Sequence, residues 1–583
     1  MNTAAVVLGV IFIIGSLVVS LYARRRTRTV LDFYLAGRRI GAFANASAIC
    51  GDYFSAASFL GVAAAVYVSG LDGVWFATGF AAGLVPVLLF LAAPLRRSGA
   101  FTIPEFLGMR FGSRAVRLTA VVLIQLVVFM YLVPQLLGLG ETWAVAIGAA
   151  LPGLTPFDTG MLVGALVMVA YVGVGGMRAA TWQQIFFFWF FFSAVLMVVA
   201  LAYLNGFRYL PALADLAPEP LRTVHEAAGE EAGVQWQVRD DPNRLHPDRP
   251  ARFGEPGHRY GAAEQVSMVL GLALGTCGLP HIIMRHLTSP TGRLARDAGT
   301  YVVILATLYY IPAVMAGVAA RALLPGILSQ DSRYAPLAVE GYLKSPEQAV
   351  LILAAGLGGD VAMGFVAAGA FAAILSTMSG LLLSGAAALS HDVYAADIDP
   401  RAPERRQILV GRLAVIAIGF LGLVMGAAMR RTGVLQTYPS VLAVMVSWVF
   451  ALAGAGLFPA LLAAIWWPRA TARGALAAML VGGGGTLLWI GLHAAHVGGV
   501  ISGPPWLEAL AGLSQPSIVT VPLAALALVL GSLRSQAQTA PQGLQDLWMR
   551  MHGTAAERPA VRLVEVSGVT DPAGGEVAGP GGG

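Results

Sequence analysis

The stretch Ile49-Cys-Gly-Asp-Tyr-Phe-Ser-Ala-Ala-Ser-Phe-Leu-Gly61 places an aspartate, two serines and two glycines inside an apolar run long enough to span a bilayer. Polar and charged side chains at that depth are costly. Irregular backbone persists inside a membrane only where it is buried in protein or lines a cavity, because hydrocarbon cannot hydrogen-bond free amides and carbonyls. The stretch therefore predicts a broken membrane helix at a binding site.

The composition of the chain is that of a polytopic membrane protein. Of its 583 residues, 57% are hydrophobic and only 12% are charged, which is far from the norm for soluble domains. The formal net charge is +6, but the arginines lie in short loops between apolar runs, as membrane topology rather than nucleic-acid binding requires. Cys50 and Cys277 lie in separate apolar runs, so neither a disulfide framework nor a cysteine metal site is expected.

Apolar runs near the roughly 20-residue length of a membrane helix occur about thirteen times. They cover residues 5–23, 43–70, 72–94, 115–138, 158–174, 182–203, 264–284, 297–323, 356–391, 408–429, 438–465, 474–495 and 516–534. The sequence thus predicts an all-α integral membrane protein with about 13 transmembrane helices.

Basic residues in alternate loops predict which side of the membrane each loop faces. The cytoplasmic set is Arg24, Arg25, Arg26, Arg28, Arg38, Arg39, Arg96, Arg97, Arg110, Arg114, Arg117, Arg285, Arg293, Arg296, Arg401, Arg405 and Arg406. The opposing loops 139–159 and 497–515 contain neither Lys nor Arg, although Arg430 and Arg431 fall on the predicted outer side. An odd helix count then places the amino terminus outside a cell (inner) membrane and the carboxyl terminus in the cytoplasm.

The apolar runs divide the chain into six segments. These are a first helix and cytoplasmic loop (1–42), a first five-helix repeat (43–203), an extracytoplasmic insert (204–263), a second five-helix repeat (264–465), two peripheral helices (466–535) and a cytoplasmic tail (536–583). The insert is dense in charge, Pro and Gly, which is typical of a solvated connector; a ligand-gathering cap or partner surface is the alternative. The Gly-, Pro-, Ala- and Glu-rich tail predicts disorder.

A second polar interruption lies in the seventh apolar run, at Leu274-Gly-Thr-Cys-Gly-Leu-Pro-His281. Pro280 removes a backbone donor, and the glycines loosen the helix. If the two breaks are equivalent, helices 2 to 6 and 7 to 11 form two halves. Paired interruptions at corresponding positions of two halves indicate an inverted-repeat secondary transporter.

The ninth run contains hydroxyl residues at helical spacing. Ala373, Ser376 and Thr377 share one helical face. Neutral hydroxyls, together with carbonyls freed by a broken helix, can bind a dehydrated alkali cation. The alternative is that these small side chains only allow close helix packing.

Four motifs together resemble the sodium:solute symporter family. They are the Gly-Asp-Tyr-Phe-Ser-Ala-Ala-Ser-Phe-Leu-Gly segment, Gly175-Gly176-Met177 with Ala179 and Trp182, Gly278-Leu-Pro280-His281-Ile-Ile-Met-Arg285, and Ser376-Thr377 with His391-Asp392-Val-Tyr394. The resemblance covers residues 30–535 and is greatest to the branch of cation/acetate and other short monocarboxylate symporters. It implies a leucine-transporter-type fold with a 5+5 inverted repeat.

The resemblance also implies a sodium site between the second and ninth runs. Its ligands would be the carbonyls of Gly51, Phe54 and Ala373 and the hydroxyls of Ser376 and Thr377. The chain departs from the family pattern at two places. Gln183-Gln184 replaces a Thr-Asp pair that many relatives carry, and Thr276 stands where some relatives have an aromatic residue. A smaller pocket suits a short carboxylate, which the positive ends of half-helices can receive.

The remaining candidates are individually weaker. Those expected to line the substrate site are Tyr53, Ser55, Ser58, Tyr131, Gln135 and Thr276. Asp52 either assists a cation or carries a proton, or it caps the half-helix that follows. His281 and Arg285, one turn apart, predict a coupling or gating ion network at the cytoplasmic end of their helix.

These observations predict sodium-coupled symport of acetate or another short monocarboxylate. The expected partners are this solute, Na⁺ as coupling ion and the lipid bilayer, with no organic cofactor, nucleic acid or obligate protein partner. The chain holds no nucleophile or metal constellation that would predict an enzyme. Proton-coupled symport, sodium-coupled uptake of another solute such as proline, and a membrane sensor built on the same helices are the alternatives.

Overall fold

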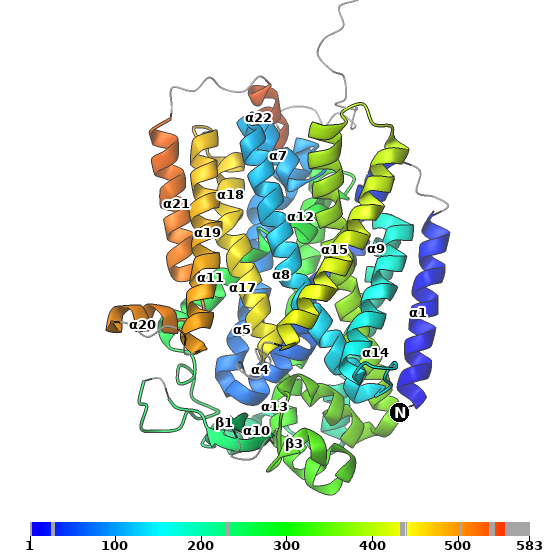
Figure 1. Ribbon diagram of the computed structural model, residues 1–583, viewed down its shortest axis with the longest axis vertical. Coiled ribbons are helices and arrows are strands. Elements are labelled where there is room, and N and C mark those ends of the chain that lie inside the picture. Colours follow the sequence, from blue (N-terminus) through cyan, green and yellow to red (C-terminus); the bar gives the residue numbers. More distant parts are fainter. Residues whose placement is uncertain are drawn as a thin grey trace, which may run out of the picture.

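The computed structural model describes residues 3–24, 29–228, 234–243, 245–431, 438, 440–498, 500, 504–535 and 543–553. Long helices run side by side between the two ends of the molecule (Figure 1). Within the described residues, nine helical stretches are long and apolar enough to cross a membrane. The protein is therefore a multi-pass membrane protein. Its thirteen crossings and its repeat remain predictions, and Arg25, Arg26 and Arg28 lie outside the described residues.

The first half of the chain contains the first predicted break. Its elements are α1 (Thr3–Arg24), α2 (Val30–Leu35), η1 (Ala36–Arg38), α3 (Ala42–Tyr53), η2 (Ala57–Gly61), α4 (Val62–Ser69), η3 (Gly70–Gly73), α5 (Val74–Pro86), η4 (Val87–Leu91), α6 (Ala92–Ser98), α7 (Ile103–Phe111), α8 (Arg114–Ala146) and α9 (Pro156–Leu204). The helix α3 ends inside the polar stretch, and η2 begins four residues later as a π-helix.

The helix α9 joins two runs that the sequence separates. The sequence leaves residues 175–181 between the predicted helices, but these residues are helical on both sides of a sharp bend at Gly176. Gly176 has a φ of 62° and a ψ of −161°, a conformation that only glycine adopts easily. A Cβ there would also lie 2.6 Å from the Phe33 ring. The bend therefore comes from the backbone of a single glycine.

The insert is more ordered than a solvated connector. It contains α10 (Tyr209–Leu216) and an antiparallel hairpin of β1 (Arg222–Ala228) and β2 (Val234–Asp240), in which Arg222 pairs with Asp240. The Asp72 carboxylate accepts hydrogen bonds from the amides of Gly257 and Arg259 at 2.5 and 2.7 Å. The high charge density of the insert predicts a solvated loop. The bonds to Asp72, which is distant in sequence, instead fix the insert to the ends of the membrane helices.

The second half begins with the second predicted break. Its elements are α11 (Ala262–Thr276), α12 (Pro280–Leu287), α13 (Gly292–Gln330), η5 (Ser332–Leu337), β3 (Ala338–Val339), β4 (Tyr342–Leu343), η6 (Pro346–Gln348), α14 (Ala349–Ala387), η7 (Ala388–Ile398), α15 (Glu404–Arg431), α17 (Val441–Gly456), α18 (Phe458–Trp466), α19 (Ala472–Val497), α20 (Pro505–Gly512), α21 (Ser517–Leu533) and α22 (Leu544–His552). The helices α17 and α18 form one stretch, and its most apolar part is completely buried, so this stretch belongs to the core.

The expectation of a disordered tail is wrong for α22, whereas residues 536–542 and 554–583 lie outside the described residues. Leu547 and Met551, four residues apart, are buried. The His552 ring lies 5.3 Å from that of Trp466. An amphipathic helix of this kind is stabilised by the surface it covers. In Figure 1, α22 lies at the opposite end of the molecule from the amino terminus and from the hairpin of the insert.

Candidate functional site

Both predicted breaks are present. The helix α3 ends at Tyr53, and Phe54 has extended backbone with a φ of −80° and a ψ of 98°. The helix α11 ends at Thr276, and α12 starts at Pro280. Proline has no amide hydrogen, but a residue in the first turn of a helix has no helical acceptor for one, so no hydrogen bond is lost. The two breaks are close, because Tyr53 at the end of α3 and Thr276 at the end of α11 have their hydroxyl oxygens 2.9 Å apart.

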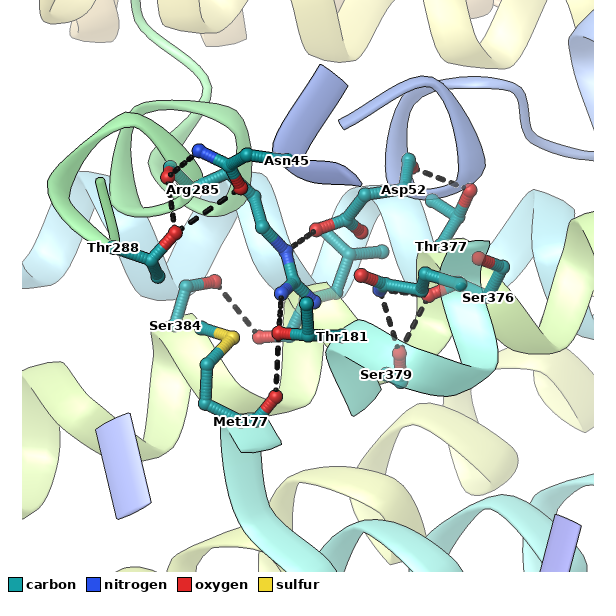
Figure 2. A network of polar contacts seen from close by, with 12 residues as sticks. Asn45, Asp52, Met177, Thr181, Arg285, Thr288, Ser376, Thr377, Ser379 and Ser384 are labelled. Atoms are coloured by element: carbon teal, nitrogen blue, oxygen red, sulfur yellow. Dashed lines mark hydrogen bonds and ion pairs between the residues drawn. The ribbon is translucent and has the colours of Figure 1, made fainter. Parts of the chain in front are cut away.

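A buried ion pair joins the two broken helices. Arg285 Nε lies 3.0 Å from Asp52 Oδ2, and both side chains are fully buried. Arg285 Nη1 also donates to Thr181 Oγ1 of α9 at 2.7 Å, and Figure 2 shows the guanidinium extending from Asp52 to Thr181. The alternative in which Asp52 caps the following half-helix is wrong. Asp52 lies in the last turn of α3, and the residue that precedes η2, Ala56, makes no side-chain cap.

His281 and Arg285 do not share the expected ion network. The His281 ring packs against Tyr131 at a centroid distance of 5.6 Å, and neither ring nitrogen has a hydrogen-bond partner among the described residues. Arg285 instead points to Asp52 at the first break. Although His281 and Arg285 are one turn apart on α12, their side chains do not bind a common partner.

Two glycines allow the close approach of helices around this ion pair. A Cβ on Gly51 would collide with the carbonyl oxygen of Gln184 in α9, and a Cβ on Gly380 in α14 would collide with Asp52 Oδ1. The three helices α3, α9 and α14 meet at these points. Any larger residue at either position must displace one of them.

The predicted sodium ligands lie on either side of the junction between α3 and α14. Thr377 Oγ1 donates to the carbonyl of Asp52 at 2.7 Å (Figure 2), which places α14 against the chain between Gly51 and Phe54. Ser376 is fully buried, and its hydroxyl has no hydrogen-bond partner among the described residues. Ala373, which shares their helical face, is also fully buried. Thr377 therefore reaches the break, and the adjacent Ser376 has an unused hydroxyl.

Gln184 belongs to this junction, although the sequence indicated it only as a departure from the family pattern. Its side-chain amide donates to the carbonyl of Ser376 at 3.0 Å and to Ser379 Oγ at 2.9 Å. It thus fixes the turn of α14 that carries the predicted ligands. The sequence did contain a signal for this role. Gln183-Gln184 is a polar pair within a run of aromatic and apolar residues, where polar side chains need a partner.

The predicted substrate residues have two kinds of surroundings. Tyr53 Oη donates to the Phe80 carbonyl at 2.7 Å and lies 2.9 Å from Thr276 Oγ1, so these two candidates touch. Ser58 Oγ is 3.0 Å from Tyr310 Oη. The rings of Phe80 and Phe450 lie 5.2 Å apart, and those of Tyr53, Tyr131 and Tyr310 lie 5.9 to 6.3 Å from one or both of them. An aromatic cluster therefore lies beside the first break.

The other two candidates satisfy backbone amides freed by the break. Gln135 Oε1 accepts from the amide of Ala56 at 3.0 Å, and Ser55 Oγ accepts from that of Ala57 at 3.2 Å. The solute was expected to bind the free amides at a half-helix amino terminus. At least two of these amides are already bonded to the side chains of Gln135 and Ser55. Gln135 Nε2 is buried and finds no partner in the described part of the chain, so its donor is unused.

A helical membrane bundle with two facing breaks, buried hydroxyls and an aromatic cluster is the architecture of a secondary transporter. A family model for the sodium:solute symporters matches residues 33–482. The chain is 31% identical to the monocarboxylic acid transporter of Corynebacterium glutamicum over 551 residues, which cover 93% of this chain and 92% of that protein. The protein belongs to the sodium:solute symporter family.

Solved structures agree on the architecture. The fold is similar to that of a Na⁺-coupled sialic acid symporter in its substrate-bound outward-open state, with a TM-score of 0.61 and 13% identity over 92% of this chain and 98% of that one. The family model and the relative from Corynebacterium glutamicum confirm the family resemblance of the sequence motifs and the expectation of a transporter rather than an enzyme.

Proposed function

We propose that the protein carries a short monocarboxylate, acetate or a close analogue, together with Na⁺ down the sodium gradient. The name of the Corynebacterium glutamicum relative supports the solute class, and the family supports the coupling ion. The observation that carries the proposal is the fully buried hydroxyl of Ser376, which has no partner among the described residues and is adjacent in sequence to Thr377, the residue that contacts the end of α3. Hydrocarbon surroundings make an unused polar atom costly unless it binds something.

The sodium ion would bind between α3 and α14. Its ligands would be the carbonyls of Gly51, Phe54 and Ala373, the Ser376 hydroxyl and the remaining lone pairs of Thr377 Oγ1. All five are neutral oxygens, and Arg285 already neutralises the neighbouring Asp52 carboxylate. A site without net charge binds a monovalent cation weakly enough to release it on the other side. Sodium bound here would join the two helices and stabilise the outward-open arrangement.

The solute would bind on the aromatic side of the first break. Tyr53 and Thr276 present a pair of hydroxyls, and Gln135 presents the unused amide donor that a carboxylate requires. Thr276 in place of an aromatic residue leaves a small site. Ser55, Ser58 and Tyr131 lie around these groups as supporting residues. Rocking of the two helical halves would then release both solutes inside, with the amino terminus outside the cell membrane and α22 in the cytoplasm.

Transport in proteoliposomes tests the proposal. Radiolabelled acetate, pyruvate and proline would be offered with a sodium gradient, with a proton gradient and with neither. We expect a sodium gradient to drive accumulation of acetate or pyruvate but not of proline. Equal uptake with and without both gradients would exclude symport, and uptake driven by protons alone would favour the proton-coupled alternative. Protein-free liposomes correct for passive permeation of the acids.

A further inference from the structure

A small cavity of about 30 Å³ lies where the insert meets the ends of the membrane helices. It is lined by Tyr67, Val68, Arg222, Thr223, Val224, His225, Trp236, Tyr342, Leu343, Lys344, Pro346 and Tyr438. These residues come from β1 and β2, from β4 and the residues that follow it, and from the end of α4, together with Tyr438. The proposed sodium and substrate residues do not line it, so it is a separate feature of the fold.

Lys344 gives this cavity a positive charge, and it is the only lysine in the 583-residue chain. Its ammonium lies 5.3 Å from the centroid of the Trp236 ring of the insert, and it donates to the Pro336 carbonyl at 2.8 Å. An ammonium group has three donors. One is used by the carbonyl, and others remain for a ligand in the cavity.

Arg321 of α13 provides a second cation, which packs against two aromatic residues of the cavity, Tyr67 and Tyr342. Its guanidinium lies 4.8 Å from the Tyr342 ring centroid and 5.9 Å from that of Tyr67, and both rings line the cavity. The side chain is 2% exposed. Nη2 donates to the Pro220 carbonyl at 3.2 Å, whereas Nη1 has no partner within the described residues. A buried cation with an unused donor attracts an anion.

Two carboxylates of the insert are already engaged. Asp240 pairs with Arg222 at 2.8 Å, and Asp241 pairs with Arg259. Burial lowers the pKa of His225 below its usual value, so this ring adds no charge near pH 7. Neither aspartate pairs with Lys344 or Arg321.

The cavity is connected to the transport site through one helix. The helix α4 follows η2 and hence the first break, and Tyr67 near its end accepts a hydrogen bond from the Leu343 amide at 3.2 Å. Twelve residues separate Ser55 from Tyr67, a span of about 18 Å on a helix. An anion held beside Lys344 would thus lie at the end of the helix that leads to the proposed substrate site.

We propose that this cavity is an outer binding site for the carboxylate group of the transported solute, formed by the insert together with Lys344 and Arg321. This inference rests on the proposed function. The volume accommodates about two water-sized groups, which corresponds to the two oxygens of a carboxylate. The insert then gathers the solute at the surface before it passes along α4.

The single lysine allows a direct test. Purified full-length protein would be treated with an amine-reactive reagent, and the rate of Lys344 modification followed by peptide mass spectrometry in sodium-free buffer. We expect acetate to slow the modification in a saturable manner, by about tenfold when the site is full, as one charge-assisted hydrogen bond implies. Acetamide, which has the same shape without the charge, should not slow it.

The outcomes separate this site from the transport site. Protection by acetate should persist in the Ser376→Ala variant, because sodium is not needed for binding at the outer cavity. Protection that requires sodium and Ser376, or a rate unchanged by acetate, would overturn the proposal. Equal protection by chloride would overturn its assignment to carboxylates. If acetate protects Lys344 but is not transported, the proposed function fails while the outer site stands.

Transport kinetics supply the second readout. Lys344→Gln should raise the KM for acetate about tenfold with the sodium dependence unchanged, and Lys344→Arg should retain most of the affinity. Arg239→Gln is the matched control, because it removes an exposed charge from the same hairpin without touching the cavity. If Arg239→Gln raised the KM equally, Lys344 would act only through nonspecific electrostatic attraction of the anion, which would contradict a defined binding site.

Discussion

Two adjacent hydroxyl residues carry the sodium proposal at the scale of single residues. Ser376→Ala and Thr377→Ala each remove one neutral oxygen from the junction of α3 and α14. We expect each to raise the sodium concentration for half-maximal uptake by about tenfold, the effect of 1.4 kcal/mol of lost binding. Ser384→Ala is the control, because Ser384 Oγ donates to the Leu381 carbonyl of its own helix. Unchanged sodium dependence in both variants would remove them from the site.

The ion pair of Asp52 and Arg285 predicts a coupled effect on stability. Asp52→Asn leaves a fully buried guanidinium without its counter-ion, and Arg285→Gln leaves the carboxylate. Breaking such a pair from one side costs about 3–5 kcal/mol. We expect both single variants to melt at clearly lower temperature in detergent and the double variant to recover much of the loss. Additive losses in the double variant would contradict an energetic pairing of the two residues.

Gly380 predicts a steric effect at the same place. The Cβ of Gly380→Ala would collide with Asp52 Oδ1, so the variant should lose stability and sodium-dependent uptake. Gly484→Ala is the matched control, since its Cβ would meet no atom within 4 Å. The control should melt at the same or a slightly higher temperature, because alanine favours a helix over glycine by about 1 kcal/mol. Equal behaviour of the two variants would show that α14 has room to move away from α3.

At the scale of elements, both breaks were predictable but the contacts between them were not. Asp52 in the first break and Pro280 in the second are costly in an apolar helix, so their positions alone indicate a break. The Asp52–Arg285 pair joins residues 233 apart in sequence, and no local pattern specifies that distance. Gln184 was visible as a polar residue, but its bonds to α14 depend on how α9 bends at Gly176. The order of the insert was missed in part because Asp72, which accepts hydrogen bonds from the amides of Gly257 and Arg259, lies on another element.

The helix α22 gives a prediction at this scale. Leu547→Asp would place a charge in the contact between α22 and the membrane helices, where Leu547 is 4% exposed. Burying an unpaired charge costs several kcal/mol, so α22 should detach and the melting temperature should fall. Gln545→Asp, on the exposed face of the same helix, should have little effect. Indistinguishable melting of the two variants would mean that α22 does not stabilise the bundle.

For the whole molecule, the sequence predicted the class of protein and the general architecture, but not the energetics of the site. Composition and run lengths were sufficient for a membrane bundle, and four motifs were sufficient for the family. The assignment of sodium and solute to opposite sides of the first break is a proposal. It depends on the bond from Thr377 to the Asp52 carbonyl on one side and on that from Tyr53 to the Phe80 carbonyl on the other. Coupling requires that neither solute moves productively without the other.

The most direct test of this coupling reverses the usual experiment. Proteoliposomes with equal sodium on both sides and no proton gradient would receive an inward gradient of acetate or pyruvate, and the movement of radiolabelled sodium would be followed. Symport predicts uphill accumulation of sodium inside, absent from protein-free liposomes and strongly reduced in the Ser376→Ala, Thr377→Ala double variant. Carboxylate uptake without any accompanying sodium movement would contradict the account.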